Sequence, residues 1–151
     1  MTIDEITEYV EGLGGVLTLA PQPGDGSPEI SWGDLFFYYS PTGIVPTTQP
    51  FATIVTKDYP DDRGSHLDRP GVFRVNVSSR ADQFDELTRA APGPSVPDAF
   101  NPHPVYGSLH WVAVVSPGAE TDARLRELLR SAHLSARARM ERRAELGSTG
   151  E

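Results

Sequence analysis

Two stretches of the sequence concentrate polar side chains that could recognise a small molecule. In the first, the alternation of residues 73–77 predicts a strand that carries Arg74 and Asn76 on one face. A guanidinium beside an amide can clamp a carboxylate or a phosphate. The alternative is that water covers this face and that Arg74 pairs with an acid such as Asp34 or Asp58. Arg74 and Asn76 are therefore candidate ligand-binding residues.

The second stretch contains His103, Tyr106 and Trp111. His103 lies between two prolines, which hold its backbone extended. Its imidazole could act as a general base, with Tyr106 as the acid or donor. The alternative is that His103 and Tyr106 anchor a long loop to the sheet through aromatic packing and a hydrogen bond. His103 and Tyr106 are the candidate catalytic residues, and whether the protein is an enzyme stays open.

Aromatic residues could form the walls of a pocket around these polar groups. The candidates are Trp32, Phe36, Tyr38, Phe51 and Trp111. Aromatic side chains on strands more often pack in a core, but residues 35–39 carry aromatic side chains on both faces of one expected strand. Either helices cover one face while a ligand or a partner covers the other, or two copies of the chain associate there. We count Trp32 and Trp111 among the candidate ligand-binding residues.

The sequence predicts no cofactor and no metal site. Four side chains that could ligate a metal lie at spacings that match no recognised pattern: His66, Asp68, His103 and His110. A nearby group of acids lacks the glycine and the glutamate of a calcium loop: Asp58, Asp61 and Asp62. The sequence also lacks the Gly-Lys-Ser/Thr of phosphate-binding loops and the Gly-x-Ser-x-Gly of nucleophile-elbow hydrolases.

Composition favours an ordinary globular domain. The chain has 151 residues, is 38% hydrophobic and contains no cysteine. A chain without cysteine has no disulfide or thiolate chemistry, which fits a reducing cytosol. No apolar run approaches the length of a membrane span, and the first residues are acidic where a signal peptide is basic. We expect a cytoplasmic protein without membrane contact.

The distribution of charge argues against nucleic acid as a partner. Residues 1–120 contain 6 Lys and Arg against 16 Asp and Glu, a net charge of −10, and residues 121–151 contain 7 against 5, a net charge of +2. An acidic body repels a phosphate backbone. Four arginines near the end of the chain are expected to complement the dipole of the last helix: Arg137, Arg139, Arg142 and Arg143. The alternative, a contact to nucleic acid or to an acidic partner, is disfavoured by the interspersed Glu141 and Glu145.

Capping signals and hydrophobic periodicity predict the elements that position these residues. Helices are expected at residues 2–13, from a cap at Ser79 to residue 91, and from a cap at Thr121 onward. Strands are expected at residues 16–19, 35–39, 51–57, 72–77 and 110–115. This order predicts a single two-layer α+β domain over residues 1–146, with an antiparallel sheet of about five strands. Residues 147–151 are expected to form a disordered tail.

Residues 92–104 form a proline-rich connection that ends at the candidate catalytic pair. Prolines limit the conformations of the loop and so lower the entropy lost in holding side chains over the sheet. We therefore predict that His103 or Tyr106 faces the same cavity as Arg74 and Asn76, with this loop as its rim. The competing hypothesis is that the loop packs on the helical side and only connects elements.

Several motifs resemble the MmcQ/YjbR-like family. Residues 110–114, followed by the Leu-Arg-Glu-Leu of residues 125–128, look like that family's His-Trp strand and final helix. The N-terminal helix that leads to the Leu-Gly-Gly-Val of residues 13–16 is similar to the opening of the family. Residues 69–76 and 103–106 look more closely like an uncharacterised group of actinobacterial proteins. The resemblance implies a YjbR-like α+β fold and brings no established activity.

The same resemblance bears on function in two ways. A DNA-binding role has been suggested for the broader family from fold shape, and one member is named from an antibiotic gene cluster, which implies a role near secondary metabolism. Our first hypothesis is that the protein binds, and as an enzyme would convert, a small anionic or polar aromatic metabolite. The alternative is an interaction module that acts as a homodimer or with a protein partner. DNA binding ranks third.

Overall fold

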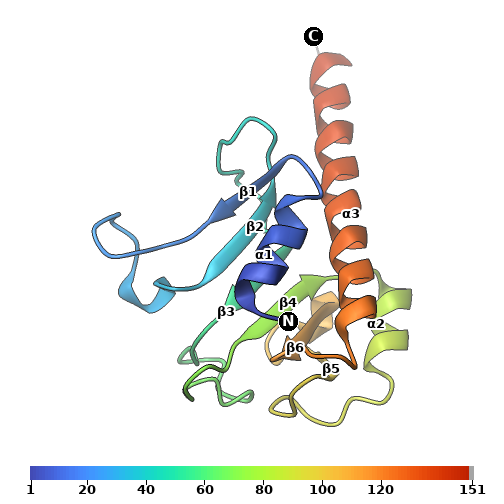
Figure 1. The fold of residues 1–151 in the computed structure, drawn as a ribbon. Helices are drawn as coiled ribbons and strands as arrows, with labels where there is room; N and C mark the ends of the chain where they lie inside the picture. The colour runs from blue at the N-terminus through green and yellow to red at the C-terminus, as the bar shows by residue number, and fades with distance from the viewer. Residues whose placement is uncertain (150–151) are drawn as a thin grey trace.

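The computed structural model describes residues 1–149, in which three α-helices pack on an antiparallel sheet of six strands (Figure 1). The expected α+β class is therefore confirmed. In chain order the elements are α1 (Ile3–Glu11), β1 (Val16–Leu19), β2 (Leu35–Tyr39), β3 (Ala52–Val55), β4 (Arg74–Ser78), α2 (Ala81–Thr88), β5 (Phe100–Pro102), β6 (Trp111–Val115) and α3 (Asp122–Thr149).

The sheet has one strand more than the sequence predicts. Its order is β1-β2-β3-β4-β6-β5, and each neighbouring pair is antiparallel. The additional strand, β5, lies inside the proline-rich connection and pairs Asn101 with Ala113 at the edge of the sheet. Pro102 is tolerated there because an edge strand has one side that needs no N–H donor. The connection thus becomes part of the sheet before it reaches His103.

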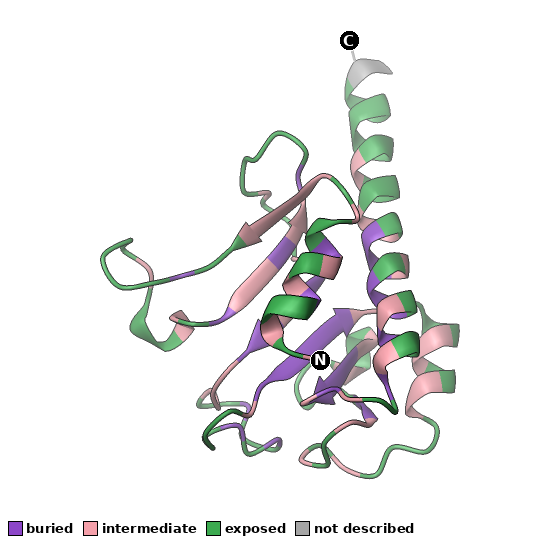
Figure 2. Ribbon diagram, viewed as in Figure 1, coloured by how far each residue is buried: buried purple, intermediate pink, exposed green. Residues whose placement is uncertain are grey.

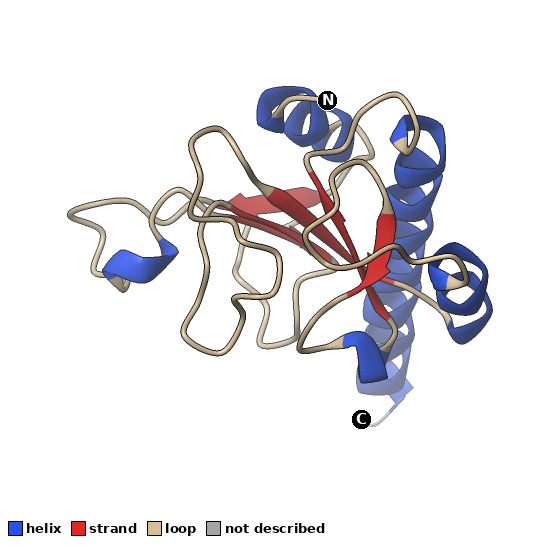
Figure 3. Cartoon of the chain, turned by 90° about the horizontal axis from the view of Figure 1, so that it is seen from below, coloured by secondary structure: helices blue, strands red, loops and turns tan. Residues whose placement is uncertain are grey.

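All three helices cover one face of the sheet (Figure 3). The strands point alternate apolar side chains into this layer, as the pattern of residues 73–77 predicts. Its core consists mainly of Phe37, Ile54, Val75, Val77, Val112 and Val114 from the strands, and Ile6, Val10, Leu125 and Leu129 from the helices. Burial is nearly continuous along β4 and β6, the strands at the centre of this packing (Figure 2).

The opposite face of the sheet is covered by long loops (Figure 3). Two of them, residues 56–73 and 103–110, contribute side chains that contact Arg74 from above the sheet. Because these loops replace water over the strands, the polar half of the alternation in β4 is buried: Arg74 is 1% and Asn76 is 2% exposed. The fold therefore builds a polar interior between the sheet and its loops.

The predicted N-terminal cap is present in α1 and absent from α2. The capping box of α1 is confirmed, since the Glu5 N–H donates to Thr2 Oγ1 at 3.1 Å and the Thr2 N–H donates to Glu5 Oε1 at 3.2 Å. The prediction that Ser79 caps α2 is wrong, because Arg80 occupies that position. Ser79 instead donates through both its N–H and its hydroxyl to the carbonyl of His110. A long-range contact to the loop before β6 outcompetes the local cap.

Thr121 precedes α3 as predicted, and its carbonyl accepts the N–H of Leu125 at 2.8 Å. Its hydroxyl, however, donates to the carboxylate of Asp98 at 2.7 Å, and that carboxylate also accepts the N–H groups of Gly118, Glu120 and Thr121. Asp98, in the loop before β5, therefore holds the turn that leads into α3 from a position more than twenty residues away.

The last helix is longer than its packed part. It continues through Thr149, so residues 147–149 of the expected tail are helical, and residues 150–151 lie outside the described residues. The second half of α3 projects beyond the sheet and is largely exposed (Figure 2). Over residues 1–149, no helix combines the length and the hydropathy that crossing a membrane requires.

Candidate functional site

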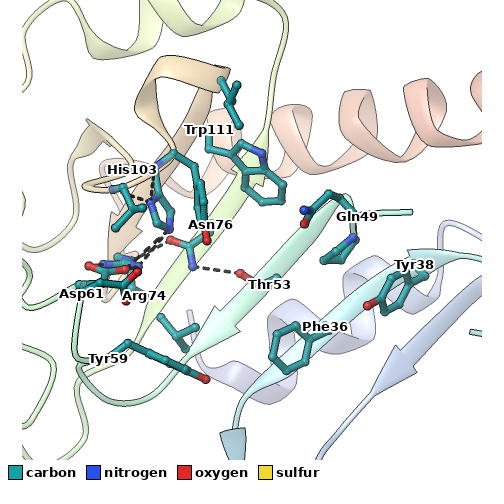
Figure 4. Close-up of a pocket in the computed structure, with 16 residues that line it drawn as sticks. Phe36, Tyr38, Gln49, Thr53, Tyr59, Asp61, Arg74, Asn76, His103 and Trp111 are labelled. Carbon is teal, nitrogen blue, oxygen red and sulfur yellow. Dashed lines mark hydrogen bonds and ion pairs between the residues drawn. The ribbon is translucent and has the colours of Figure 1, made fainter. Parts of the chain in front are cut away.

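A cavity of about 430 Å³ opens between the sheet and the loops that cover it (Figure 4). This volume is in the range of sites for small metabolites. Strands β2, β3, β4 and β6 form its floor, and residues from three loops form its rim. Figure 4 shows the ionic groups gathered at one end, beside Arg74, and aromatic rings with Gln49 at the other.

Five of the six predicted site residues line this cavity: Arg74, Asn76, His103, Tyr106 and Trp111. The prediction that His103 or Tyr106 shares a cavity with Arg74 and Asn76 is confirmed, and the loop that carries them forms part of the rim. Trp32 lies elsewhere. Its carbonyl accepts from Lys57 at 2.8 Å and its indole N–H donates to Ser27 at 3.2 Å, outside the lining of the cavity.

The guanidinium of Arg74 is bound by the protein itself. Its Nε donates to Asn76 at 2.7 Å, Nη1 donates to Asp62 and Ser65 at 3.0 Å each, and Nη2 donates to Asp62 at 2.5 Å. Four of the five N–H groups are thus used, and the fifth faces His103 (Figure 4). The acid that pairs with Arg74 is Asp62, not either of the acids that the sequence suggests.

The ion pair leaves little net charge at this end of the cavity. Burial raises the pKa of Asp62, but the hydrogen bonds and the charge of Arg74 outweigh burial and hold this pKa below its usual range. Asp62 is therefore ionised at neutral pH and compensates Arg74 through a two-oxygen contact. An anionic ligand would have to displace a buried carboxylate to reach the guanidinium.

His103 joins the loop to this ion pair. Its Nδ1 accepts the N–H groups of Val105 and Tyr106 at 3.0 Å each, and its ring lies 4.9 Å from that of Tyr106. Its Nε2 lies 3.2 Å from Nη2 of Arg74 and 3.9 Å from the Asp62 carboxylate. Burial and then the charge of Arg74 lower the pKa of His103 to about 4, so the ring is neutral at pH 7.

A neutral imidazole has one lone pair for accepting a proton. If that lone pair is on Nδ1, two backbone amides use it, and if it is on Nε2, the guanidinium of Arg74 uses it. In either tautomer the lone pair contacts a protein N–H. The geometry therefore favours the loop-anchoring hypothesis for His103 over the general-base hypothesis.

Several polar groups around the cavity have no protein partner among the described residues. They are the indole N–H of Trp111, the hydroxyls of Tyr38 and Tyr106, the amide of Gln49 and the carboxylate of Asp61. Asn76 adds a partly free amide, because only one hydrogen bond from its Nδ2 is formed, to Thr53 at 3.0 Å. These groups can hydrogen-bond to a ligand without breaking an existing contact.

Tyr59 forms a further wall that the sequence did not single out. Its hydroxyl donates to Asp34, a carboxylate that is 0% exposed and also accepts from Thr56 and Lys57. Burial, with the hydrogen bond and the charge of Asp34, raises the pKa of Tyr59 well above its usual value. The phenol stays protonated, and its ring is held in place at the cavity. Strand alternation could not predict the contact between Tyr59 and Asp34, because Tyr59 lies in a loop.

Within residues 1–149, no group of three or more His, Cys, Asp or Glu side chains is arranged to hold a metal ion. The acids near residue 60 have separate roles instead: Asp62 pairs with Arg74, Asp58 accepts the N–H of Leu67 at 2.8 Å, and Asp61 faces the cavity.

One family of proteins matches the chain over both its fold and its cavity. Residues 1–145 match the family of unknown function DUF6194, a span that includes every strand and every residue that lines the cavity. No curated protein and no solved structure matches the chain.

Proposed function

The chain belongs to DUF6194, a family of unknown function, and we propose that it binds a small, polar aromatic molecule in the cavity described above. The observation that carries this proposal is the set of unpaired polar atoms, led by the indole N–H of Trp111 and the hydroxyl of Tyr38, on aromatic walls of a 430 Å³ cavity. Aromatic surfaces with a few hydrogen-bonding groups are typical of metabolite sites.

The sequence suggests either an anionic or a polar aromatic ligand, and the ion pair of Arg74 with Asp62 favours the second. Arg74 is 1% exposed and already pairs with Asp62, so it has no free charge for an anion. Asp61, by contrast, is exposed and has no ion-pair partner among the described residues. At this end of the cavity a neutral or weakly cationic group is therefore favoured over a carboxylate or a phosphate.

The aromatic end of the cavity supplies most of the contact area. Phe36 and Tyr38 project from β2, and Trp111 projects from the start of β6 (Figure 4). An aromatic ring packed against such side chains gains about 0.5–1.5 kcal/mol per ring contact beyond burial alone. The amide of Asn76 lies between this surface and the ionic end, where it can orient a polar substituent of the ring (Figure 4).

Binding is proposed here ahead of turnover. A general base needs a lone pair that reaches the substrate, and the lone pair of His103 contacts protein N–H groups in both tautomers. Tyr106 is 49% exposed at the rim, where it is suited to covering a ligand.

The alternative of an interaction module rests on exposed aromatics in β2. Phe37 is 0% exposed, Tyr39 packs against His133 at 5.4 Å, and Phe36 and Tyr38 line the cavity. Phe37 is buried within one chain, and Phe36 and Tyr38 are half-buried and line the cavity. The observation that motivates a homodimer through β2 is therefore weaker than the one that motivates a ligand.

We further propose a distant family relationship and a cellular location for the protein. The His-Trp strand and the Leu-Arg-Glu-Leu helix that resemble MmcQ/YjbR-like proteins form β6 and α3, which are consecutive in this fold. This order supports a distant relationship to that family. A cytoplasmic, actinobacterial protein acting near secondary metabolism is the setting that the resemblance implies, and the lack of cysteine agrees with the cytoplasm.

The two tryptophans allow a direct test. Trp111 lies in the cavity and Trp32 lies outside it, so Trp32→Phe and Trp111→Phe give matched single-tryptophan proteins. A panel of small aromatic amides, phenols and amines is screened by thermal shift, and hits are titrated by fluorescence of each variant. We expect a hit to change the emission of the Trp32→Phe protein and not that of the Trp111→Phe protein. Equal responses of both variants, or a panel without any hit, would contradict the proposal.

A further inference from the structure

A second, smaller cavity adjoins the first at its aromatic end. It has a volume of about 270 Å³ and lies between α3 and the loop that follows β2. Tyr38 and Gln49 line both cavities, so the two spaces share one boundary. Tyr38 and Gln49 are thus the wall between the cavities, and a ligand arm that passed them would reach α3.

Two arginines of α3 line this second cavity, Arg139 and Arg143. Residues four positions apart lie on the same face of a helix. Neither guanidinium forms an ion pair or a hydrogen bond with another described residue, whereas the neighbouring Arg137 pairs with Glu141 at 2.9 Å. Two unpaired like charges at this spacing repel each other slightly, and an anion between them would remove that cost.

The free cations contrast with the charges elsewhere in the chain. The protein has a formal net charge of −8, and the other end of the large cavity presents the unpaired carboxylate of Asp61. A ligand with one acidic substituent would meet repulsion near Asp61 and attraction near Arg139 and Arg143. The two ends of the combined space thus differ in sign, which would orient such a ligand.

We propose that Arg139 and Arg143 bind the anionic group, a carboxylate or a phosphate, of the molecule whose ring occupies the large cavity. This inference rests on the proposed function, and it adds the ligand class: an aromatic compound with an acidic group on a flexible arm. Tyr38 and Gln49 flank the arm where it passes between the cavities. The anion meets two guanidinium groups, the side chains that best match carboxylate and phosphate oxygens.

The test uses acids and matched uncharged compounds. Phenylacetate, phenylbutyrate and phenylhexanoate are titrated by calorimetry beside their primary amides, and the corresponding phenylalkyl phosphates separate phosphate from carboxylate as the anion. We expect at least one acid to bind about tenfold more tightly than its amide, a difference of about 1.4 kcal/mol. We expect this advantage to shrink in about 1 M salt, where the Debye length is about 3 Å.

Variants on one helix supply the controls. Arg139→Gln/Arg143→Gln is expected to abolish the advantage of the acid and to leave the affinity of the amide unchanged. Arg142→Gln removes the same kind of charge one position away, outside the cavity lining, and is expected to keep the advantage.

The outcomes distinguish this inference from the one on which it rests. Amides that bind while acids gain nothing, or an advantage that survives in the double variant, would overturn the anion site and leave the aromatic cavity standing. Failure of acids and amides alike to bind would overturn both.

Discussion

The Nη2 atom of Arg74 and the Nε2 atom of His103 lie 3.2 Å apart, and both side chains are buried. Arg74 comes from the central strand β4, and His103 comes from the connection between β5 and β6. Their contact, together with Asp62, whose carboxylate lies within 3.9 Å of both, connects the rim of the cavity to its floor. Such ties hold a binding site in shape before the ligand arrives, which lowers the entropy cost of binding.

Replacing Arg74 by methionine should strongly destabilise the protein. The change leaves the buried carboxylate of Asp62 without its compensating charge, and breaking one partner of a buried pair costs about 3–5 kcal/mol. Arg74→Lys should also lose stability, because a single ammonium cannot reproduce the fork that reaches Asn76, Asp62 and Ser65. Urea denaturation followed by circular dichroism measures the free energy of unfolding.

The control for this prediction is an exposed ion pair. Arg80 lies 3.3 Å from Asp82 and donates to Ser131 at 3.2 Å, and the Arg80 and Asp82 side chains are mostly exposed, so Arg80→Met should cost no more than about 1 kcal/mol. Adding Asp62→Asn to Arg74→Met should recover part of the loss, because the unpaired charge is removed. A larger effect at Arg80 than at Arg74 would contradict the structural role assigned to the buried pair.

Acidification should destabilise the protein through His103 before the carboxylates titrate. The pKa of this histidine is lowered to about 4 by burial and by Arg74, from an ordinary value of 6.5. Its contribution to stability is therefore fully present above pH 6.5 and is lost as the pH falls toward 4, since the unfolded chain takes up the proton first. The loss should be on the order of 3 kcal/mol, measured as the free energy of unfolding against pH.

The assignment to His103 is checked by substitution. His103→Gln should flatten the slope of stability between pH 6.5 and 4, whereas the exposed His66→Gln should leave it unchanged. The carboxyl of Asp62, whose pKa is held low by Arg74 against the opposing effect of burial, loses its contribution only at still lower pH. An unchanged slope in His103→Gln would show that another group carries the transition.

Features that depend only on residues close together in the sequence could be predicted from it. Alternation in β4 places Arg74 and Asn76 on one face and Val75 and Val77 on the other, because strand side chains alternate wherever the strand lies. The Thr2–Glu5 capping box is likewise local. The sequence grouped six residues at one site, and all of them except Trp32 line the cavity.

Contacts made by loops could not be predicted in the same way. Asp62 and Ser65 lie 12 and 9 residues before Arg74, in a segment without periodicity, and nothing in its residue types marks them as partners of a strand arginine. Ser79 has the residue type of a cap, but a carbonyl brought close by the tertiary fold takes its hydrogen bonds. Burial of the polar face by loops changed Arg74 from an expected ligand clamp into a paired charge.

Removing the Asp98 carboxylate should loosen the start of α3. Burial raises the pKa of Asp98, but hydrogen bonds from Thr121, Gly118 and Glu120 lower it overall, which shows that the ionised form is the bound one. Asp98→Ala should cost about 1–3 kcal/mol, because it leaves the donors of the turn before α3 without their acceptor. Thermal and urea unfolding measure the loss.

The backbone at Asp98 provides a second comparison. Its φ of 54° lies in the left-handed region, which asparagine tolerates better than alanine does. Asp98→Asn should therefore lose less stability than Asp98→Ala, because it retains one acceptor oxygen and the tolerated conformation. Equal stability of Asp98→Ala and the wild type would contradict the role of Asp98 in holding the turn before α3.

Two substitutions of Tyr59 can separate the role of its ring, which lines the cavity, from the role of its hydroxyl, which bonds to Asp34. Tyr59→Phe removes the hydrogen bond to the buried Asp34, which keeps its contacts from Thr56 and Lys57, and should cost about 1.5–3 kcal/mol, as for hydrogen bonds to charged groups. The ring remains, so the affinity for an aromatic ligand should change little. Tyr59→Ala removes the ring as well and should weaken binding in addition to stability. Calorimetric titration of both variants with one aromatic amide, beside their unfolding curves, checks the two effects separately, and equal ligand affinity in Tyr59→Ala and the wild type would remove Tyr59 from the binding surface.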